Sequence, residues 1–172
     1  GTGNVGIGAY AGIQITTGAS NTAVGINAMY ATTTAGSNVS IGQNSMYVNT
    51  TGYSSVAVGY LALDAQTTAA NNVAVGVNAL GAVTTGANNV GLGLSSGVLI
   101  NTGAQNIVIG SYAGQTLTTG TYNVYIGYNC NPSAVGVTTE IVIGTGNHTG
   151  KGPQTGFIAP AAGAVYQGNN ST

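Results

Sequence analysis

The stretch Asn72-Val73-Ala74-Val75-Gly76 holds the pattern that decides the fold. Its glycine belongs to a series that recurs every seventeen residues without a slip: Gly8, Gly25, Gly42, Gly59, Gly76, Gly93, Gly110, Gly127 and Gly144. Self-similarity at a short fixed period indicates a repeat architecture, in which each unit buries its apolar surface against its neighbours. The sequence therefore predicts an all-β parallel solenoid of nine 17-residue coils.

One short strand per repeat is expected just before each of these glycines. In Val73-Ala74-Val75 and its equivalents, β-branched residues flank a residue that is small in most repeats. Side chains of a strand point to opposite faces in turn, so the two kinds of residue must lie on opposite sides. We expect the β-branched residues to face inward. The residues between them would face outward and allow a second subunit to approach closely; they include Gly6, Ala23, Ser40, Ala57, Ala74 and Gly91.

Two further elements recur around the strand. A Thr-Thr-Gly triplet, or a near copy such as Thr33-Thr34-Ala35, occurs in most repeats and is expected to form a return strand with its turn. An asparagine precedes most of the inward strands, at Asn21, Asn38, Asn72, Asn89, Asn106 and Asn123. Stacked asparagines can join successive coils through their side-chain amides.

The repeat pattern defines two segments. Residues 1–146 carry the β-roll repeats, whereas the alternation of apolar residues stops after Gly144. Residues 147–172 contain Pro153 and Pro160 and are expected to form an extended C-terminal tail. Because Gly1 is neither an initiator Met nor the start of a signal-like segment, we expect the chain to be a piece of a longer protein.

Composition excludes several classes of partner. Only Asp64, Glu140 and Lys151 carry a charge at neutral pH, and the net charge is −1. One lysine cannot neutralise a phosphate backbone, so we expect no nucleic-acid partner. Gly, Asn and Thr interrupt every apolar run, so no membrane insertion is expected. With 43% apolar residues and so little net charge, the chain should nevertheless be folded.

The sequence offers no catalytic, cofactor or metal site, and we expect a protein that is not an enzyme. His148 and Asp64 would stand about 24 Å apart on a stack of coils, too far for a Ser-His-Asp triad. Asp64 and Glu140 are likewise too distant to act as a carboxylate pair. The match of residues 1–6 to G-x-G-x-x-G lacks the strand and helix that a dinucleotide site requires. His148 would bind a metal only if the histidines of three subunits met on a symmetry axis. Cys130 is expected to be a small packed residue.

The clustering of Tyr122, Tyr125 and Tyr128 in one repeat suggests an aromatic patch. We predict that these three residues contact a receptor, with a glycan as one candidate.

The repeat unit resembles the head domains of trimeric autotransporter adhesins, whose Asn-Ser-Val-Ala-Ile-Gly unit is similar to residues 72–76. Those heads are left-handed parallel β-rolls, and the resemblance implies an intertwined homotrimer. The longer form, in which Asn21 to Gly25 is followed by Asn27-Ala28-Met29-Tyr30 and Thr33-Thr34, looks more like repeats in bacteriophage tail-fibre proteins.

The final segment, from Thr155-Gly156-Phe157-Ile158 to Val165-Tyr166 and residues 167–172, resembles the stretch that leads into an endosialidase-type intramolecular chaperone. In that family the chaperone trimerises the fibre and then removes itself by cleavage. The resemblance implies that a chaperone domain followed residue 172 and was released.

Together these observations predict an extracellular virion protein, a trimeric tail-fibre segment that serves host attachment as a spacer or a receptor-binding tip. Its expected partners are two further copies of itself, other fibre or baseplate proteins and a host surface receptor. Two alternatives stay open. One is the head of a trimeric cell-surface adhesin. The other is an ice-binding solenoid that uses a threonine ladder at Thr16, Thr33, Thr50, Thr67 and Thr84.

Overall fold

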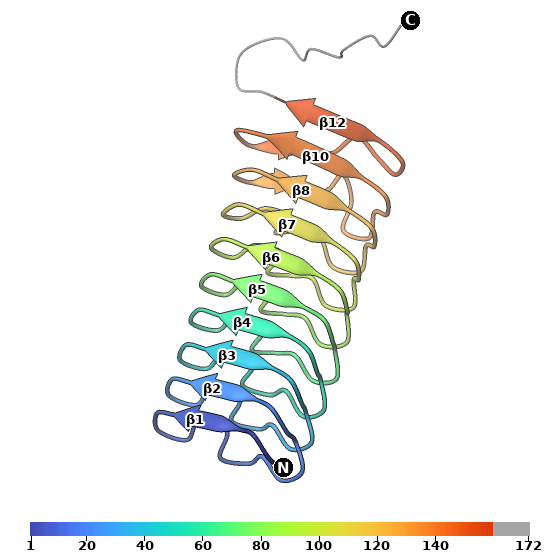
Figure 1. Ribbon diagram of the computed structural model, residues 1–172. Coiled ribbons are helices and arrows are strands. Elements are labelled where there is room, and N and C mark those ends of the chain that lie inside the picture. Colours follow the sequence, from blue (N-terminus) through green and yellow to red (C-terminus); the bar gives the residue numbers. More distant parts are fainter. Residues whose placement is uncertain (160–172) are drawn as a thin grey trace, which may run out of the picture.

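A computed structural model describes residues 1–159, and this part of the chain is all-β with no helix (Figure 1). Each coil adds one short strand to a single ten-stranded parallel sheet. The strands of this sheet are β1 (Val5–Ile7), β2 (Thr22–Val24), β3 (Val39–Ile41), β4 (Val56–Val58), β5 (Val73–Val75), β6 (Val90–Leu92), β7 (Ile107–Ile109), β8 (Val124–Ile126), β10 (Ile141–Gly144) and β12 (Gly156–Ala159). The structure confirms the parallel solenoid predicted from the glycine spacing.

The register between coils follows the repeat length. Val56 pairs with Val73 on the next coil, seventeen residues on, and the same offset holds as far as the pairing of Val124 with Ile141. The last junction is shorter, because Ile141 pairs with Gly156. The sheet therefore continues past residue 146, where the sequence analysis placed the end of the repeats. A second, two-stranded sheet pairs β9 (Cys130–Asn131) with β11 (His148–Thr149). The part of the predicted tail from residue 160 onward lies outside the described residues.

The prediction of which strand face is buried was wrong. The middle residues Ala23, Ala57 and Ala74 are completely buried, whereas Ile41 and Val75 are 40% exposed. The interior of a coil is too narrow for β-branched side chains from every strand, as Gly91 shows. A Cβ atom at Gly91 would lie 2.6 Å from Leu80 Cγ. Alternation reveals a strand, but the space across the coil decides which of its faces turns inward.

The core is filled mostly by residues of the turns opposite the strand. Two columns of side chains run along the inside of the solenoid. The first column contains Met29, Met46, Leu63 and Leu80, and the second contains Val83, Ile100 and Leu117, all fully buried. The strand contributes a third column of mostly small residues, which increases in size to Val108 and Tyr125 near the C-terminal end.

A ladder of buried asparagines joins the coils, as the sequence analysis expected. Asn89 is typical: its Nδ2 atom donates to Asn72 Oδ1 (3.3 Å) and to Gly103 O (2.9 Å). Its Oδ1 atom accepts from the backbone N and from Nδ2 of Asn106, both at 3.0 Å. Each amide thus satisfies polar groups of its own coil and of both neighbours, in an interior where an unmet group costs about 1–3 kcal/mol.

Ser55 takes the place of an asparagine in the ladder, so the side-chain amide of Asn72 loses its acceptor on the previous coil. The side chain of Gln66 supplies an acceptor instead. The Ser55 hydroxyl still accepts from the backbone N of Asn72, at 3.2 Å. The spare amide hydrogen of Asn72 goes instead to Gln66 Oε1, also at 3.2 Å. Among residues 1–159, the buried Gln66 Nε2 atom has no hydrogen-bond partner. One substitution in the ladder therefore accounts for a buried glutamine in the adjacent turn.

The Thr-Thr-Gly triplets do not form the return strand predicted from the sequence; they form bends. The backbone N atoms of Thr33, Thr34 and Ala35 all donate to one acceptor, Thr50 O, at 3.1–3.2 Å. Three successive N–H groups that converge on one carbonyl cannot alternate in direction as a strand requires. The threonine hydroxyls add to the same junction, because Thr33 Oγ1 donates to Thr50 O at 3.2 Å.

The recurring glycine lets two coils approach closely at the end of each strand. Gly25 has φ 131°. A Cβ atom at Gly25 would lie 2.7 Å from the carbonyl carbon and oxygen of Gly42 on the next coil. Both the backbone conformation and the spacing therefore require glycine here.

Candidate functional site

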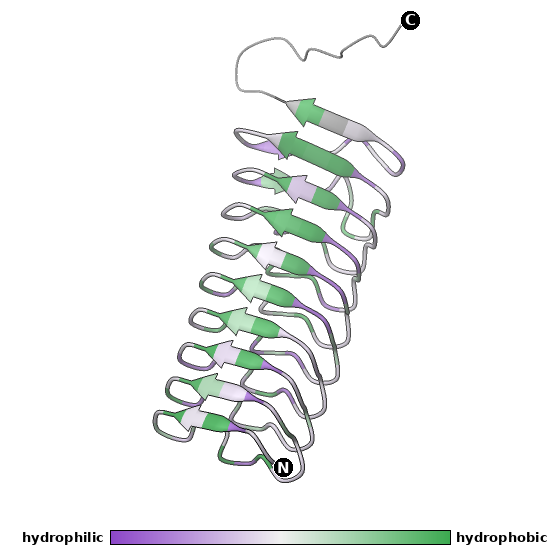
Figure 2. Ribbon diagram, viewed as in Figure 1, coloured by the Kyte–Doolittle hydropathy of each residue, from purple (hydrophilic) through white to green (hydrophobic). Residues whose placement is uncertain are grey.

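The most extensive candidate surface is the outer face of the ten-stranded sheet. Figure 2 shows apolar residues along this row of strands. They form two parallel rows, the first and third residues of each strand, and the term outer sheet face refers to these rows below. Its most exposed members are Val5, Ile7, Ile41, Val75, Ile107, Ile141 and Ile158. Ten strands at a spacing of about 4.8 Å make these rows about 43 Å long.

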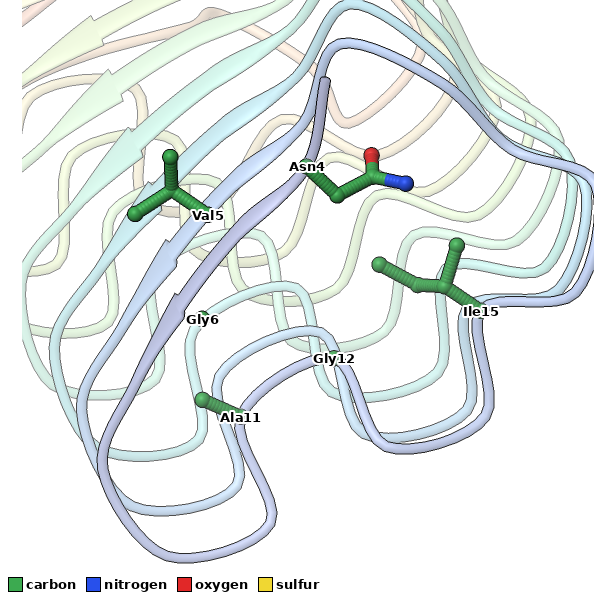
Figure 3. Close-up of a pocket in the computed structure, with 6 residues that line it drawn as sticks. All are labelled: Asn4, Val5, Gly6, Ala11, Gly12 and Ile15. Atoms are coloured by element: carbon green, nitrogen blue, oxygen red, sulfur yellow. The ribbon is translucent and has the colours of Figure 1, made fainter. Parts of the chain in front are cut away.

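A cavity of about 180 Å³ opens at the N-terminal end of the solenoid (Figure 3). It lies where the core of the first coil is not covered by another coil. The residues that line it are Asn4, Val5, Gly6, Ala11, Gly12 and Ile15. None of these side chains can transfer a proton or act as a nucleophile.

The three tyrosines predicted to contact a receptor do not form one surface. Tyr125 is completely buried, so it cannot contact a receptor from the folded chain. Tyr122 and Tyr128 are 58% and 55% exposed and stand before and after strand β8. A receptor contact through these two residues stays a prediction. Tyr128 instead packs edge to face against Tyr112, with ring centroids 6.2 Å apart.

A different group of tyrosines comes together at the N-terminal coils. The rings of Tyr30 and Tyr47 are stacked, with centroids 5.2 Å apart and an interplanar angle of 7°. Tyr10 meets Tyr30 edge to face at 6.4 Å. Asp64 occupies the position of Tyr47 one repeat later. Tyr30 and Tyr47 share one slot of adjacent repeats, a sequence signal from which this stack could have been predicted.

The other carboxylate, Glu140, ends the asparagine ladder. Its backbone N donates to Asn123 Oδ1 (2.9 Å), as a ladder asparagine would. Its fully buried side chain has no amide hydrogens and instead accepts from three groups. Oε2 accepts from Tyr125 Oη (3.0 Å) and from Ser133 N (3.1 Å), and Oε1 accepts from Gly152 N (2.7 Å). Burial, and next the adjacent Glu140 charge, hold the pKa of Tyr125 far above its usual range.

Cys130 and His148 lie side by side, although they are eighteen residues apart, because β9 pairs with β11. The buried Cys130 thiol donates to Ile126 O at 3.4 Å, and burial raises its pKa, so the group is a packed thiol and not a thiolate nucleophile. Strands β5 to β8 and β10 separate His148 from Asp64. Within residues 1–159 no three His, Cys, Asp or Glu side chains gather in a way that could hold a metal ion.

Threonines form two neighbouring rows. In the row that was considered for ice binding, the hydroxyls take part in coil-to-coil bonds, such as Thr50 Oγ1 to Thr67 O (3.2 Å) and Thr67 Oγ1 to Thr84 O (3.1 Å). The second row is exposed and unbroken over seven coils. Its members are Thr17, Thr34, Thr51, Thr68, Thr85, Thr102 and Thr119.

The fold defines this chain as a parallel β-solenoid repeat protein. No protein family matches the sequence, and no curated protein or solved structure is significantly similar to it. Over residues 1–159 the chain contains no helix that is long and apolar enough to span a membrane.

Proposed function

We propose that this chain is a structural segment of a homotrimeric bacteriophage tail fibre, which serves host attachment as a spacer or a receptor-binding tip. In this role it performs no catalysis and is part of an extracellular virion. It would assemble with other fibre or baseplate proteins and bind a host surface receptor. The outer sheet face is the observation that carries this proposal.

The outer sheet face supports self-association through aliphatic side chains. Exposed apolar surface that continues over several hundred Å² marks interaction sites in soluble proteins. Here the row of third residues is apolar in all ten strands, whereas Thr22 and Gly156 interrupt the row of first residues. Ile41 and Val75, both third residues, are 40% exposed. A threefold axis parallel to the rod would bury the same rows of three copies together. The proposal therefore retains the subunit contact along the strands that was expected from the sequence. It assigns this contact to the β-branched residues and not to the small residues between them.

Light scattering combined with charge substitutions tests this assembly. We expect a mass of about 50 kDa, three times the 16.7 kDa chain. Replacing Ile41 and Val75 by Lys should produce monomers, because each subunit would place two charges in the apolar interface. The matched control replaces the exposed Thr51 and Thr85 by Lys and should stay trimeric. A wild-type monomer, or a trimer that survives Ile41→Lys with Val75→Lys, would contradict the proposal.

The alternative, the head of a trimeric cell-surface adhesin, would have the same homotrimeric assembly but would be attached to a bacterial cell and not to a virion. Adsorption distinguishes the two: purified fibre protein should compete with phage particles for host cells. Antibodies against the chain should label virions. Labelling of a bacterial outer surface instead would favour the adhesin.

Ice binding is a second candidate, favoured by the exposed threonine row from Thr17 to Thr119. Stacked coils place successive hydroxyl and methyl groups about one strand spacing, about 4.8 Å, apart, a regular array that could order water. Thermal hysteresis at millimolar protein should then be measurable and should vanish when Thr51, Thr68 and Thr85 are replaced by Lys. Its absence in the wild-type protein would remove this candidate.

A further inference from the structure

The cavity at the N-terminal end of the solenoid has the same walls as a space that is filled inside it. Gly6 and Gly12 line the cavity, and Gly91 and Gly97 occupy the same positions five repeats later. The interior space is filled by Leu80, which projects from the preceding coil. Cβ atoms at Gly91 and Gly97 would lie 2.6 Å from Leu80 Cγ and 2.8 Å from Leu80 Cδ2, respectively. The two glycines therefore make room for one leucine side chain.

The isoleucine beside each space is also the same. A Cβ atom at Gly12 would lie 2.9 Å from Ile15 Cδ1, and a Cβ atom at Gly97 would lie 2.8 Å from Ile100 Cδ1. Figure 3 shows Gly12 and Ile15 at the opening of the N-terminal cavity. Within residues 1–159 the first coil has no coil stacked on this side, so the counterpart of Leu80 is the one part of the arrangement that is missing.

The asparagine ladder ends at the same place with a donor to spare. Asn4 Nδ2 donates to Gly18 O at 2.8 Å and, in the part of the chain that the structure describes, to no second acceptor. In the matching interior coil, Nδ2 and the backbone N of Asn89 both donate to Asn72 Oδ1, at 3.3 and 2.8 Å. The first coil therefore presents the donors that pair with a ladder asparagine of an adjacent coil.

The edge of strand β1 adds a requirement for glycine. β1 is the first strand of the ten-stranded sheet, so one of its edges can still pair with a parallel strand. At the matching interior junction, Gly93 N donates to Val75 O at 2.8 Å. A Cβ atom at Gly76 would clash with Gly93 O. A coil stacked against Gly8, the counterpart of Gly93, must therefore carry glycine at the same position.

We propose that the N-terminal end of the solenoid is the docking site for one more coil of the same 17-residue repeat, which inserts a leucine or methionine side chain between Gly6 and Gly12. This coil lies parallel to the first, with an asparagine beside Asn4 and a glycine beside Gly8. The coil-to-coil interface of the interior, with the same bonds and packing, identifies this occupant. A small apolar ligand would fill the cavity but leave the Asn4 amide unpaired. The inference depends on the solenoid alone and goes beyond the proposed function.

A fusion in register tests the docking site. A copy of residues 69–85, which contains Leu80, is joined directly to Gly1, so that each copied residue stands seventeen positions before its counterpart in the first coil. Amide hydrogen exchange at Gly8 reports docking, because the Gly8 N–H group then donates to a carbonyl of the added coil. We expect this exchange to slow about a hundredfold or more relative to the unfused chain, as a terminal coil becomes an interior one.

Substitutions within the added copy show whether the leucine fills the cavity. Leu80→Ala in the copy should remove at least about thirtyfold of the protection, because it empties the cavity again. Val77→Ala in the copy is the matched control, because Val77 is 46% exposed and the change shortens an apolar side chain outside the cavity. A nuclear Overhauser contact should appear between the methyl groups of the added leucine and Ile15, since Leu80 Cδ2 and Ile100 Cδ1 meet at Gly97.

Several outcomes would overturn the inference. They are Gly8 exchange that is unchanged in the fusion, protection that survives Leu80→Ala in the copy, and the absence of a methyl contact with Ile15. Gly8 exchange that slows with concentration in the unfused chain would assign the end to a second copy and would also overturn it. Slow exchange at Ala57, in the middle of the solenoid, verifies that each fusion is folded. These readouts are local to the first coil, so they are independent of whether the chain forms a trimer.

Discussion

The N-terminal coils around Met29 and Met46 and the C-terminal coils around Gly97 and Gly114 fill the same core in opposite ways. In the first region a long side chain projects inward from a turn residue with positive φ, 53° at Met29 and 47° at Met46. In the second region glycine takes this position, with φ 59° at Gly97 and 60° at Gly114. Left-handed backbone conformations cost about 1 kcal/mol or more for residues with a Cβ, so Met29 and Met46 carry strain at this position that Gly97 and Gly114 avoid.

The residue three positions later compensates for this difference. Thr32 and Asn49 follow the methionines, whereas Ile100 and Leu117 follow the glycines. A Cβ atom at Gly97 would lie 2.8 Å from Ile100 Cδ1 and 2.9 Å from Val108 Cγ2, so neighbouring side chains already occupy that space. In these four coils different residues therefore supply the side chains that fill the core.

The asparagine ladder is shared by both regions, so cutting it should have the largest effect. Asn89→Ala removes two donated and two accepted hydrogen bonds of a buried amide. It leaves Gly103 O and the amide of Asn106 short of partners, and we expect a loss of about 4 kcal/mol in the free energy of unfolding. Urea denaturation measures this loss. Thr85→Ala, on the exposed face of the adjoining turn, should change stability by less than about 0.5 kcal/mol.

Exchanging the filling pattern between the regions would test the compensation directly. Met46→Gly leaves a cavity and should cost about 3 kcal/mol, reduced somewhat by the release of backbone strain. Adding Asn49→Ile copies the arrangement of Gly97 and Ile100 and should recover part of this loss, because the exchange also removes the buried hydrogen bonds of Asn49 with Gly52 N (2.9 Å) and Gly52 O (3.2 Å). A double-mutant cycle in urea measures the coupling. If the two effects merely add, the two positions do not share one volume.

The C-terminal coils should show a stability that falls in alkali, because of Tyr125. The pKa of Tyr125 in the folded chain lies far above its ordinary value of about 10. The unfolded chain therefore releases this proton first as the pH rises. The contribution of Tyr125 to the free energy of unfolding should be constant below about pH 9. Above about pH 10 this contribution should fall by up to about 1.4 kcal/mol per pH unit. Denaturation of Tyr125→Phe at several pH values should lack this component, and an unchanged slope would contradict the assignment.

Thr32, in the N-terminal coils, offers the smallest test. Its buried hydroxyl has no hydrogen-bond partner in the part of the chain that the structure describes, and it stands at a position where the C-terminal coils hold aliphatic residues. Thr32→Val keeps the shape and removes the unsatisfied group, so we expect a gain of about 1 kcal/mol. Thermal unfolding measures this gain. A loss of stability would show that a bound water or a neighbour satisfies the hydroxyl.

The candidate surfaces were predicted only in part from the sequence. The repeat implied a subunit contact along the strands, but the prediction assigned it to the small residues such as Ala57, which the fold buries. The tyrosine cluster was predicted at the eighth strand, where Tyr125 instead fills the core beside Glu140. That cluster was predicted because its three tyrosines lie close together in the sequence. The stack of Tyr30 and Tyr47 arises from proximity across coils, seventeen residues apart.

The sequence by itself determined the solenoid, its register and the amide ladder. A fixed period of seventeen residues, together with a glycine that tolerates no side chain, leaves the backbone one way to stack, as at Gly25 against Gly42. Only the tertiary structure decided which strand face is buried and how each coil fills its core. Alternation is symmetric with respect to the two faces of a strand. The choice between them depends on the space left by turn residues such as Leu80 opposite Gly91, which becomes defined only when the coil closes.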